Sequence, residues 1–158
     1  MKVAFVLGTS TGGTARHVRM LAAGAAARGV STEVFGPAQT DEDFAFGTIA
    51  GVEFTPVEIA DRPRVRQDLR AVRRVGRLTA AWRPDVVHAH LASAILLSRV
   101  ARPFAPVPLL VGTSHTPHED RRLTYLLYRI TNGLGDRWTS ISRAGIEAHE
   151  RADRKSVV

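Results

Sequence analysis

Short apolar runs alternate with longer amphipathic segments along the whole chain. A short, nearly continuous apolar run that ends in glycine or polar residues is typical of a buried parallel strand. Such runs fall at residues 2–8, 31–36, 51–59, 85–90, 108–115 and 137–142, and the third is broken at Pro56. The pattern predicts strands at these positions.

Helical spacing fills most of the intervals between these runs. Segments with apolar residues three and four positions apart lie at 14–28, 65–82, 93–101, 122–131 and 143–152. Residues 37–50 and 116–122 are polar and irregular and are expected to be loops. Regular alternation of strand and helix predicts an α/β protein with a doubly wound, mainly parallel sheet, right-handed crossovers and helices on both faces.

The first helix carries clear start and stop signals. Thr14 can cap its amino end, and Gly29 can end it in a left-handed conformation. Val18, Leu21 and Ala22 lie on one face between them. We expect that face to pack on the sheet.

The segment from residue 61 to 83 holds most of the excess positive charge. The chain has a net charge of +7, and this segment alone has eight arginines and two aspartates. Its apolar stripe, which runs from Val65 to Trp82, is expected to pack on the sheet, with most arginines on the opposite side. This arginine face has two interpretations. It is either simply solvated, or its charge attracts anionic lipid weakly over Arg62–Arg83. Nucleic acid is not expected, because no aromatic platform or reading helix accompanies the charge.

Composition narrows the class of protein. A chain of 158 residues with 44% apolar and 23% charged residues fits one soluble domain. It contains no cysteine, so disulfides and thiolate chemistry are excluded. No run of 18 apolar residues is present, and the first residues enter a strand at once. We therefore expect a cytoplasmic protein, either free in the cytoplasm or in peripheral contact with the inner face of the membrane.

The carboxyl ends of the predicted strands select candidate binding residues. Ligands of doubly wound sheets bind beyond these ends, so the residues that follow the strands should line one edge. The candidates are Gly12, Gly13, His90, His115, His118, Ser142 and Arg143.

The loop "GTSTGGT" at residues 8–14 fits no familiar nucleotide motif. It is neither the G-x-G-x-x-G fingerprint nor a P-loop, and no acidic residue ends the second strand. Two glycines before a helix would let backbone N–H groups approach an oxygen-rich ligand at the positive helix end. The alternative is a tight turn between strand and helix.

The histidines have several interpretations. His88 is expected to be a structural residue that is hydrogen-bonded within the fold, whereas His90, at the exit of its strand, is placed to meet a ligand or to cap a loop. His118 is expected in a loop facing water, and His17, like His149, needs no function. No third ligand with metal-site spacing joins any pair of histidines, so no metal is expected.

Taken together, these segments resemble the N-terminal half of retaining, family-4-type glycosyltransferases of the GT-B fold. The resemblance rests on "LGTSTGGTARHVRM", "RPDVVHAH", "GTSH" and "TSIS", of which "PDVVHAH" after a basic helix is the most specific. It covers nearly the whole chain and implies a Rossmann-like domain over residues 1–158. The loop "SHTPHEDRR" departs from the family pattern.

The resemblance implies an acceptor-binding domain whose nucleotide-sugar partner domain is absent. No two glutamates have the Glu-x7-Glu spacing of that second domain, and "ADRKSVV" resembles the start of the linker to it. By resemblance, Gly12, Gly13 and the basic Arg16 would face the cleft, His90 would reach the transferred sugar or the phosphates, and His115 would lie beside the acceptor. No cofactor or metal is implied, because positive groups and a helix end stabilise the leaving diphosphate.

Two function classes remain open from the sequence. The first is the acceptor side of a glycosyltransferase that is inactive alone and whose acceptor is a sugar, a lipid-linked sugar or a small molecule. The second is a free-standing module that binds an anion or a lipid headgroup without catalysis. A reading frame that continues past Val158 into a domain with Glu-x7-Glu would favour the first.

Overall fold

The computed structural model describes residues 1–8, 12–60, 65–115 and 122–147. Within these ranges the chain forms a six-stranded sheet in the order β3-β2-β1-β4-β5-β6, and every neighbouring pair is parallel. The strand order reverses at β1, so β1 and β4 lie side by side at the centre. The strands are β1 (Lys2–Leu7), β2 (Ser31–Gly36), β3 (Val52–Pro56), β4 (Val86–His90), β5 (Leu109–Ser114) and β6 (Arg137–Ser140). The predicted doubly wound, Rossmann-like fold is confirmed.

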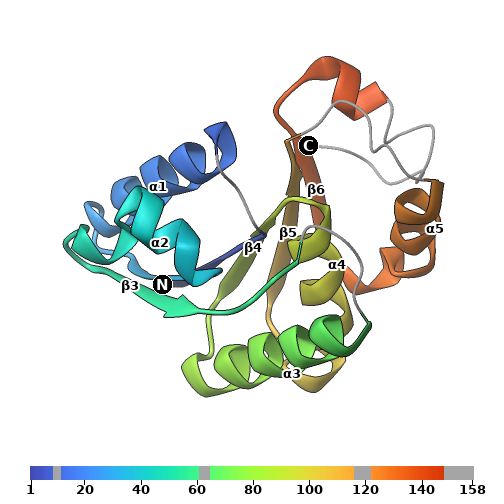
Figure 1. The fold of residues 1–158 in the computed structure, drawn as a ribbon, viewed down its shortest axis with the longest axis horizontal. Coiled ribbons are helices and arrows are strands. Elements are labelled where there is room, and N and C mark those ends of the chain that lie inside the picture. The colour runs from blue at the N-terminus through green and yellow to red at the C-terminus, as the bar shows by residue number, and fades with distance from the viewer. Residues whose placement is uncertain (9–11, 61–64, 116–121, 148–158) are drawn as a thin grey trace.

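Helices cover both faces of this sheet (Figure 1). They are α1 (Gly13–Ala26), α2 (Ala38–Phe44), α3 (Val65–Trp82), α4 (Ala92–Ala101) and α5 (Arg122–Ile130). Because side chains alternate along a strand, Phe5 and Leu7 pack with α1 on one face, while Ala4 and Val6 join the core beneath α3 and α4 on the other. Helix α5 joins this second core through the fully buried Tyr128.

Two local predictions are wrong. Residues 37–50 are not an irregular loop, because they form α2 and a short 3-10 turn, Phe46–Thr48. Only Thr40 of α2 is buried, so the helix leaves no apolar periodicity in the sequence. Thr14 does not cap α1, since that helix already begins at Gly13, with Gly12 at the cap position and no capping side chain.

The end of α1 and the break at Pro56 agree with the prediction. Gly29 has a φ of +74°, and the N–H groups of Gly29 and Val30 donate to the carbonyls of Ala26 and Ala25. These bonds satisfy the last carbonyls of the helix. Strand β3 ends at Pro56, on an edge of the sheet.

Helix α3 packs on the fold over only part of its predicted apolar stripe. Val75 is buried, and the neighbouring Gly76 lets α3 approach Ala101 of α4 closely. Val65 and Leu69, in contrast, are 75% and 53% exposed. The expectation that the whole stripe packs on the sheet is therefore wrong at the amino end of the helix, because the close contact with α4 begins only further along it.

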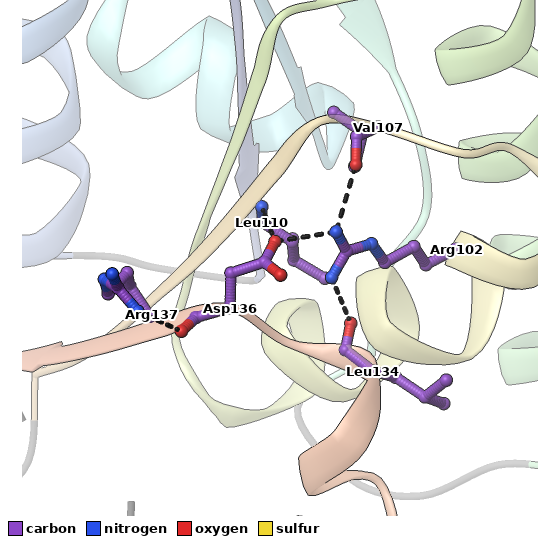
Figure 2. Close-up of polar contacts among 6 residues, drawn as sticks. All are labelled: Arg102, Val107, Leu110, Leu134, Asp136 and Arg137. Atoms are coloured by element: carbon purple, nitrogen blue, oxygen red, sulfur yellow. Dashed lines mark hydrogen bonds and ion pairs between the residues drawn. The ribbon is translucent and has the colours of Figure 1, made fainter. Parts of the chain in front are cut away.

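An ion pair ties the end of α4 to the last two strands (Figure 2). The Arg102 guanidinium lies 2.7 Å from a carboxylate oxygen of Asp136 and also donates to the carbonyls of Leu134 and Val107, each at 3.0 Å. The same carboxylate oxygen accepts the N–H of Leu110 at 2.8 Å. This cluster joins the starts of β5 and β6, away from the carboxyl ends of the strands.

Candidate functional site

Strand order brings the predicted residues to one edge of the sheet. His90 ends β4, and its register partners are Leu7 at the end of β1 and Thr113 near the end of β5. His115 directly follows β5, whereas Gly12 and Gly13 follow β1 and open α1. The strand-end rule thus correctly places these residues next to one another.

Four imidazole rings gather at this edge. The ring of His90 lies 4.1 Å from that of His88, 5.3 Å from that of His115 and 6.1 Å from that of His17, centroid to centroid. The rings of His17 and His115 are 5.4 Å apart and meet edge to face. We call these four residues the imidazole cluster.

His17 is the member of the cluster that sequence reasoning missed. It lies on α1, four residues after Gly13, so it faces the carboxyl edge of the sheet just inside the glycine loop. A signal was present, because Gly-Gly followed by a basic residue and His-Val belongs to the family pattern. Helical periodicity alone gave no reason to assign His17 a function.

His90 occupies the centre of the cluster and is fully buried, rather than open to solvent at the strand exit. Its Nδ1 lies 3.0 Å from Nε2 of His115, a hydrogen bond between two rings. Its Nε2 is also buried and has no hydrogen-bond partner among the residues that the structure describes. An unsatisfied buried polar atom is costly, which makes this nitrogen a candidate for contact with a ligand.

The backbone after His90 is strained. Leu91 has a φ of +73° and a ψ of +152°, a region that residues other than glycine rarely adopt. Its N–H donates to the carbonyl of Thr113, and its carbonyl accepts the N–H of Ile95 in α4. These bonds and the packing of the Leu91 side chain hold the turn, which fixes the position of His90.

His88 has a structural role, as predicted. Its Nε2 lies 2.7 Å from Oγ1 of Thr113, which lies 2.6 Å from Oγ1 of Thr139. These side-chain hydrogen bonds join β4 to β5 and β5 to β6, so the ring of His88 is held within the fold.

Burial keeps His88, His90 and His115 uncharged near neutral pH. Burial lowers the pKa of His88 to about 4, and the nearby His17 and His115 add to the effect. Burial also holds the pKa of His90 well below its usual value, with smaller contributions from the other three rings. Burial, followed by His17, lowers the pKa of His115 to about 4. Each of these three rings therefore carries a single proton at pH 7.

The amino end of α1 is open. Gly12 and Gly13 are exposed, and a Cβ at either position would meet no atom within 4 Å, so packing within the described residues does not require glycine there. The first turn of α1 contains no acidic residue, and Arg16 in it is exposed. This leaves the amino end of α1 accessible at Gly12 and Gly13, with the positive charge of Arg16 beside His17.

The remaining predicted residues lie farther along the same edge or outside the described part. The hydroxyl of Ser142 accepts the N–H of Gly145 at 3.1 Å and so caps the helical residues 143–147, of which Arg143 is exposed. Both follow β6, one strand beyond β5. His118 lies outside the described residues. Within the described ranges, no three His, Asp or Glu side chains are placed to hold a metal ion.

The comparisons with known proteins decide the family. The profile of Glycosyltransferase Family 4 matches residues 11–158. The chain belongs to glycosyltransferase family 4. A search of the curated proteins finds no match. The family 4 fold seen here is that of the N-terminal domain of GT-B glycosyltransferases.

Solved structures share this fold at low sequence identity. HepE from Anabaena, in complex with UDP and glucose, is 20% identical with a TM-score of 0.71, over 96% of this chain and 41% of that one. MurG from Acinetobacter baumannii is 9% identical with a TM-score of 0.66, over 89% and 41%. The UDP-GlcNAc 2-epimerase from Neisseria meningitidis, bound to UDP-GlcNAc, is 13% identical with a TM-score of 0.68, over 96% and 43%.

The family 4 chain spans about two fifths of the length of these three proteins. None of its helices within the described residues is long and apolar enough to cross a membrane.

Proposed function

We propose that this family 4 chain is the acceptor-binding domain of a glycosyltransferase that moves a sugar from a nucleotide-sugar donor to a hydroxyl acceptor. The observation that carries the proposal is the buried Nε2 of His90, which has no hydrogen-bond partner among the described residues and lies near the open amino end of α1. HepE, of the same fold, was solved with UDP and glucose, which supports a nucleotide-sugar donor.

Each part of the site has a role in this proposal. The N–H groups at Gly12 and Gly13, with Arg16, stabilise negative charge on the donor phosphates or the acceptor. His90 forms a hydrogen bond to a sugar hydroxyl or a phosphate oxygen. His115, Ser142 and Arg143 line the acceptor side. No metal or cofactor is needed, because the helix end and the cationic side chain stabilise the leaving diphosphate.

We infer that the chain alone transfers no sugar, because it spans only about two fifths of its structural neighbours. Stabilisation of a leaving diphosphate needs groups preorganised on both sides of a cleft. A protein in which this domain is followed by one with Glu-x7-Glu would supply the second side.

The test compares the 158-residue chain with the protein translated from its complete reading frame. Each is incubated with UDP-glucose, UDP-N-acetylglucosamine or GDP-mannose and a panel of sugar and lipid-linked acceptors. The proposal expects a glycosylated acceptor only with the longer protein. Turnover by the chain alone would refute its inactivity, and an epimerised donor without transfer would refute the transferase. A complete frame that ends at Val158 and binds UDP without turnover would favour a binding module.

The arginine face of α3 supports a second proposal, a weak contact with anionic membrane lipid. Arg66, Arg70, Arg73 and Arg77 lie at helical spacing on the exposed side of α3, with no ion-pair partner among the described residues. The exposed Val65 and Leu69 adjoin the amino end of this row. Charge attracts such a face to an anionic surface, and exposed apolar side chains can enter it.

Vesicle sedimentation tests this contact. The proposal expects binding to vesicles with phosphatidylglycerol and not to phosphatidylcholine alone. Arg66→Glu with Arg70→Glu should abolish it, whereas Arg28→Glu with Arg137→Glu, an equal change of charge at two exposed positions outside α3, should lower it far less. Equal losses in both variants would indicate a plain solvated face that responds only to net charge.

A further inference from the structure

The hydrogen bond between His90 and His115 determines whether Nε2 of His90, which has no partner among the described residues, carries a proton or a lone pair. Both rings are neutral near pH 7, because burial lowers the pKa of each. Nδ1 of His90 and Nε2 of His115, 3.0 Å apart, must therefore share one proton, with one nitrogen donating and the other accepting. Each of the two arrangements fixes the tautomer of both rings.

The two arrangements differ in whether Nε2 of His90 carries a lone pair or a proton. If His90 donates from Nδ1, its buried Nε2 carries a lone pair, which a phosphate oxygen cannot satisfy because it only accepts. If His115 donates from Nε2, then Nε2 of His90 carries the proton. A buried N–H there can bind a phosphate oxygen and equally the oxygen of a sugar hydroxyl.

Neighbouring side chains and backbone hold the ring of His90 in one orientation. The ring is fully buried, it lies 4.1 Å from the ring of His88, and His17 contacts it edge to face. The strained turn at Leu91 fixes the backbone beside it. Within the described part of the chain, the Nε2 of His115 is the only hydrogen-bond partner of the His90 ring, so it alone can select the tautomer.

We propose that His115 is a positioning residue: its Nε2–H donates to Nδ1 of His90 and thereby presents Nε2–H of His90 to the ligand. This inference rests on the proposed function, since it assigns His115 a role through His90 at the same site. It adds that the acceptor-side histidine acts on the transfer step without touching the transferred group. His17 packs against both rings without a hydrogen bond to either and serves as the matched control.

Two-bond ¹H–¹⁵N correlation spectra of the imidazole rings, recorded at pH 7.5, test the proposal directly. They distinguish a protonated ring nitrogen from an unprotonated one. We expect His90 to be protonated at Nε2 in the unmodified chain and in His17→Gln. His115→Gln, whose amide N–H can still donate, should keep this tautomer, whereas His115→Ala should give a mixture. A His90 protonated at Nδ1 in the unmodified chain overturns the proposal even if no variant folds.

Kinetics on the complete protein supply the second readout. His115→Ala should lower kcat on the order of tenfold to a hundredfold, the range seen when partners that orient metal-bound histidines are removed. His115→Gln should restore most of the loss. Equal kcat values for the two variants, with different His90 tautomers, would overturn the positioning role. If His90 has the expected tautomers but the complete protein shows no turnover, the proposed function is refuted and the assignment of the protons stands.

Discussion

At the scale of single residues, His88 and His90 show how two neighbours on one strand face can differ in role. Both are neutral and largely enclosed, but Nε2 of His88 has a threonine partner, whereas that of His90 has none in the part of the chain that the structure describes. The sequence alone predicted this difference from the position of His90 at the strand end. It could not predict that His17 would contact His90, because the rotation of α1 about its own axis depends on packing across the sheet.

The difference predicts opposite outcomes for two alanine substitutions in the complete protein. His90→Ala should lower kcat on the order of a hundredfold, because it removes a donor that acts in the transition state. His88→Ala should leave kcat closer to normal and lower the free energy of unfolding by about 1–3 kcal/mol, because Thr113 loses a buried hydrogen-bond partner. Steady-state kinetics and urea denaturation measure both. An unchanged kcat in His90→Ala would remove His90 from the site.

At the scale of elements, the strands were predictable and the short polar helix was not. Parallel strands buried on both faces leave apolar runs that can be read directly, as in β1 and β4. Helix α2 buries only Thr40, so no periodicity revealed it. Helix α3 shows the opposite case, because its apolar periodicity predicted more packing than occurs. The periodicity indicates which residues can pack but not how far along the helix the packing extends, and Val65 and Leu69 are exposed.

The pairing of Arg102 with Asp136 yields a prediction about how β5 and β6 are held together. Asp136→Ala should lower the free energy of unfolding by about 1–3 kcal/mol, because the N–H of Leu110 loses its side-chain acceptor and the half-buried guanidinium keeps two carbonyl acceptors but loses its carboxylate. Asp136→Asn keeps an acceptor for Leu110 and should lose less. Asp43→Ala, an exposed change on α2, is the matched control in urea denaturation. A loss no larger than that of the control would show that the ion pair does not stabilise the fold.

At the scale of the whole molecule, the imidazole cluster links stability to pH. In the unfolded chain His88 titrates near 6.5, but in the folded protein its pKa is about 4, and that of His90 is lowered in the same direction. A group whose pKa is lowered on folding stabilises the protein fully above the unfolded value. That contribution is lost as the pH falls from 6.5 towards 4, because the unfolded state then binds more protons.

We therefore expect the protein to lose stability in mildly acidic solution. His88 alone should contribute a loss of about 1.4 kcal/mol for each pH unit between 6.5 and 4. Urea denaturation at pH 7.5, 6 and 5 measures the trend, and His88→Gln should make it shallower. Glu33, whose pKa is raised mainly by burial, changes stability in the opposite sense around its own titration and does not account for a loss on acidification. Equal stability at pH 7.5 and 5 would contradict a lowered pKa of His88 and His90 in the folded protein.

The empty space around Gly13 implies that this position trades stability for function. Alanine would fit in the described surroundings and should stabilise α1 by less than the roughly 0.5–1 kcal/mol of a helix interior, because Gly13 is the first helical residue. If a diphosphate approaches the helix end, however, the added methyl group should obstruct it. Gly13→Ala should then raise the melting temperature and weaken the binding of UDP to the complete protein, measured by calorimetry. A more stable variant that binds UDP with undiminished affinity would show that the diphosphate does not approach this end of the helix and that binding does not require glycine at position 13.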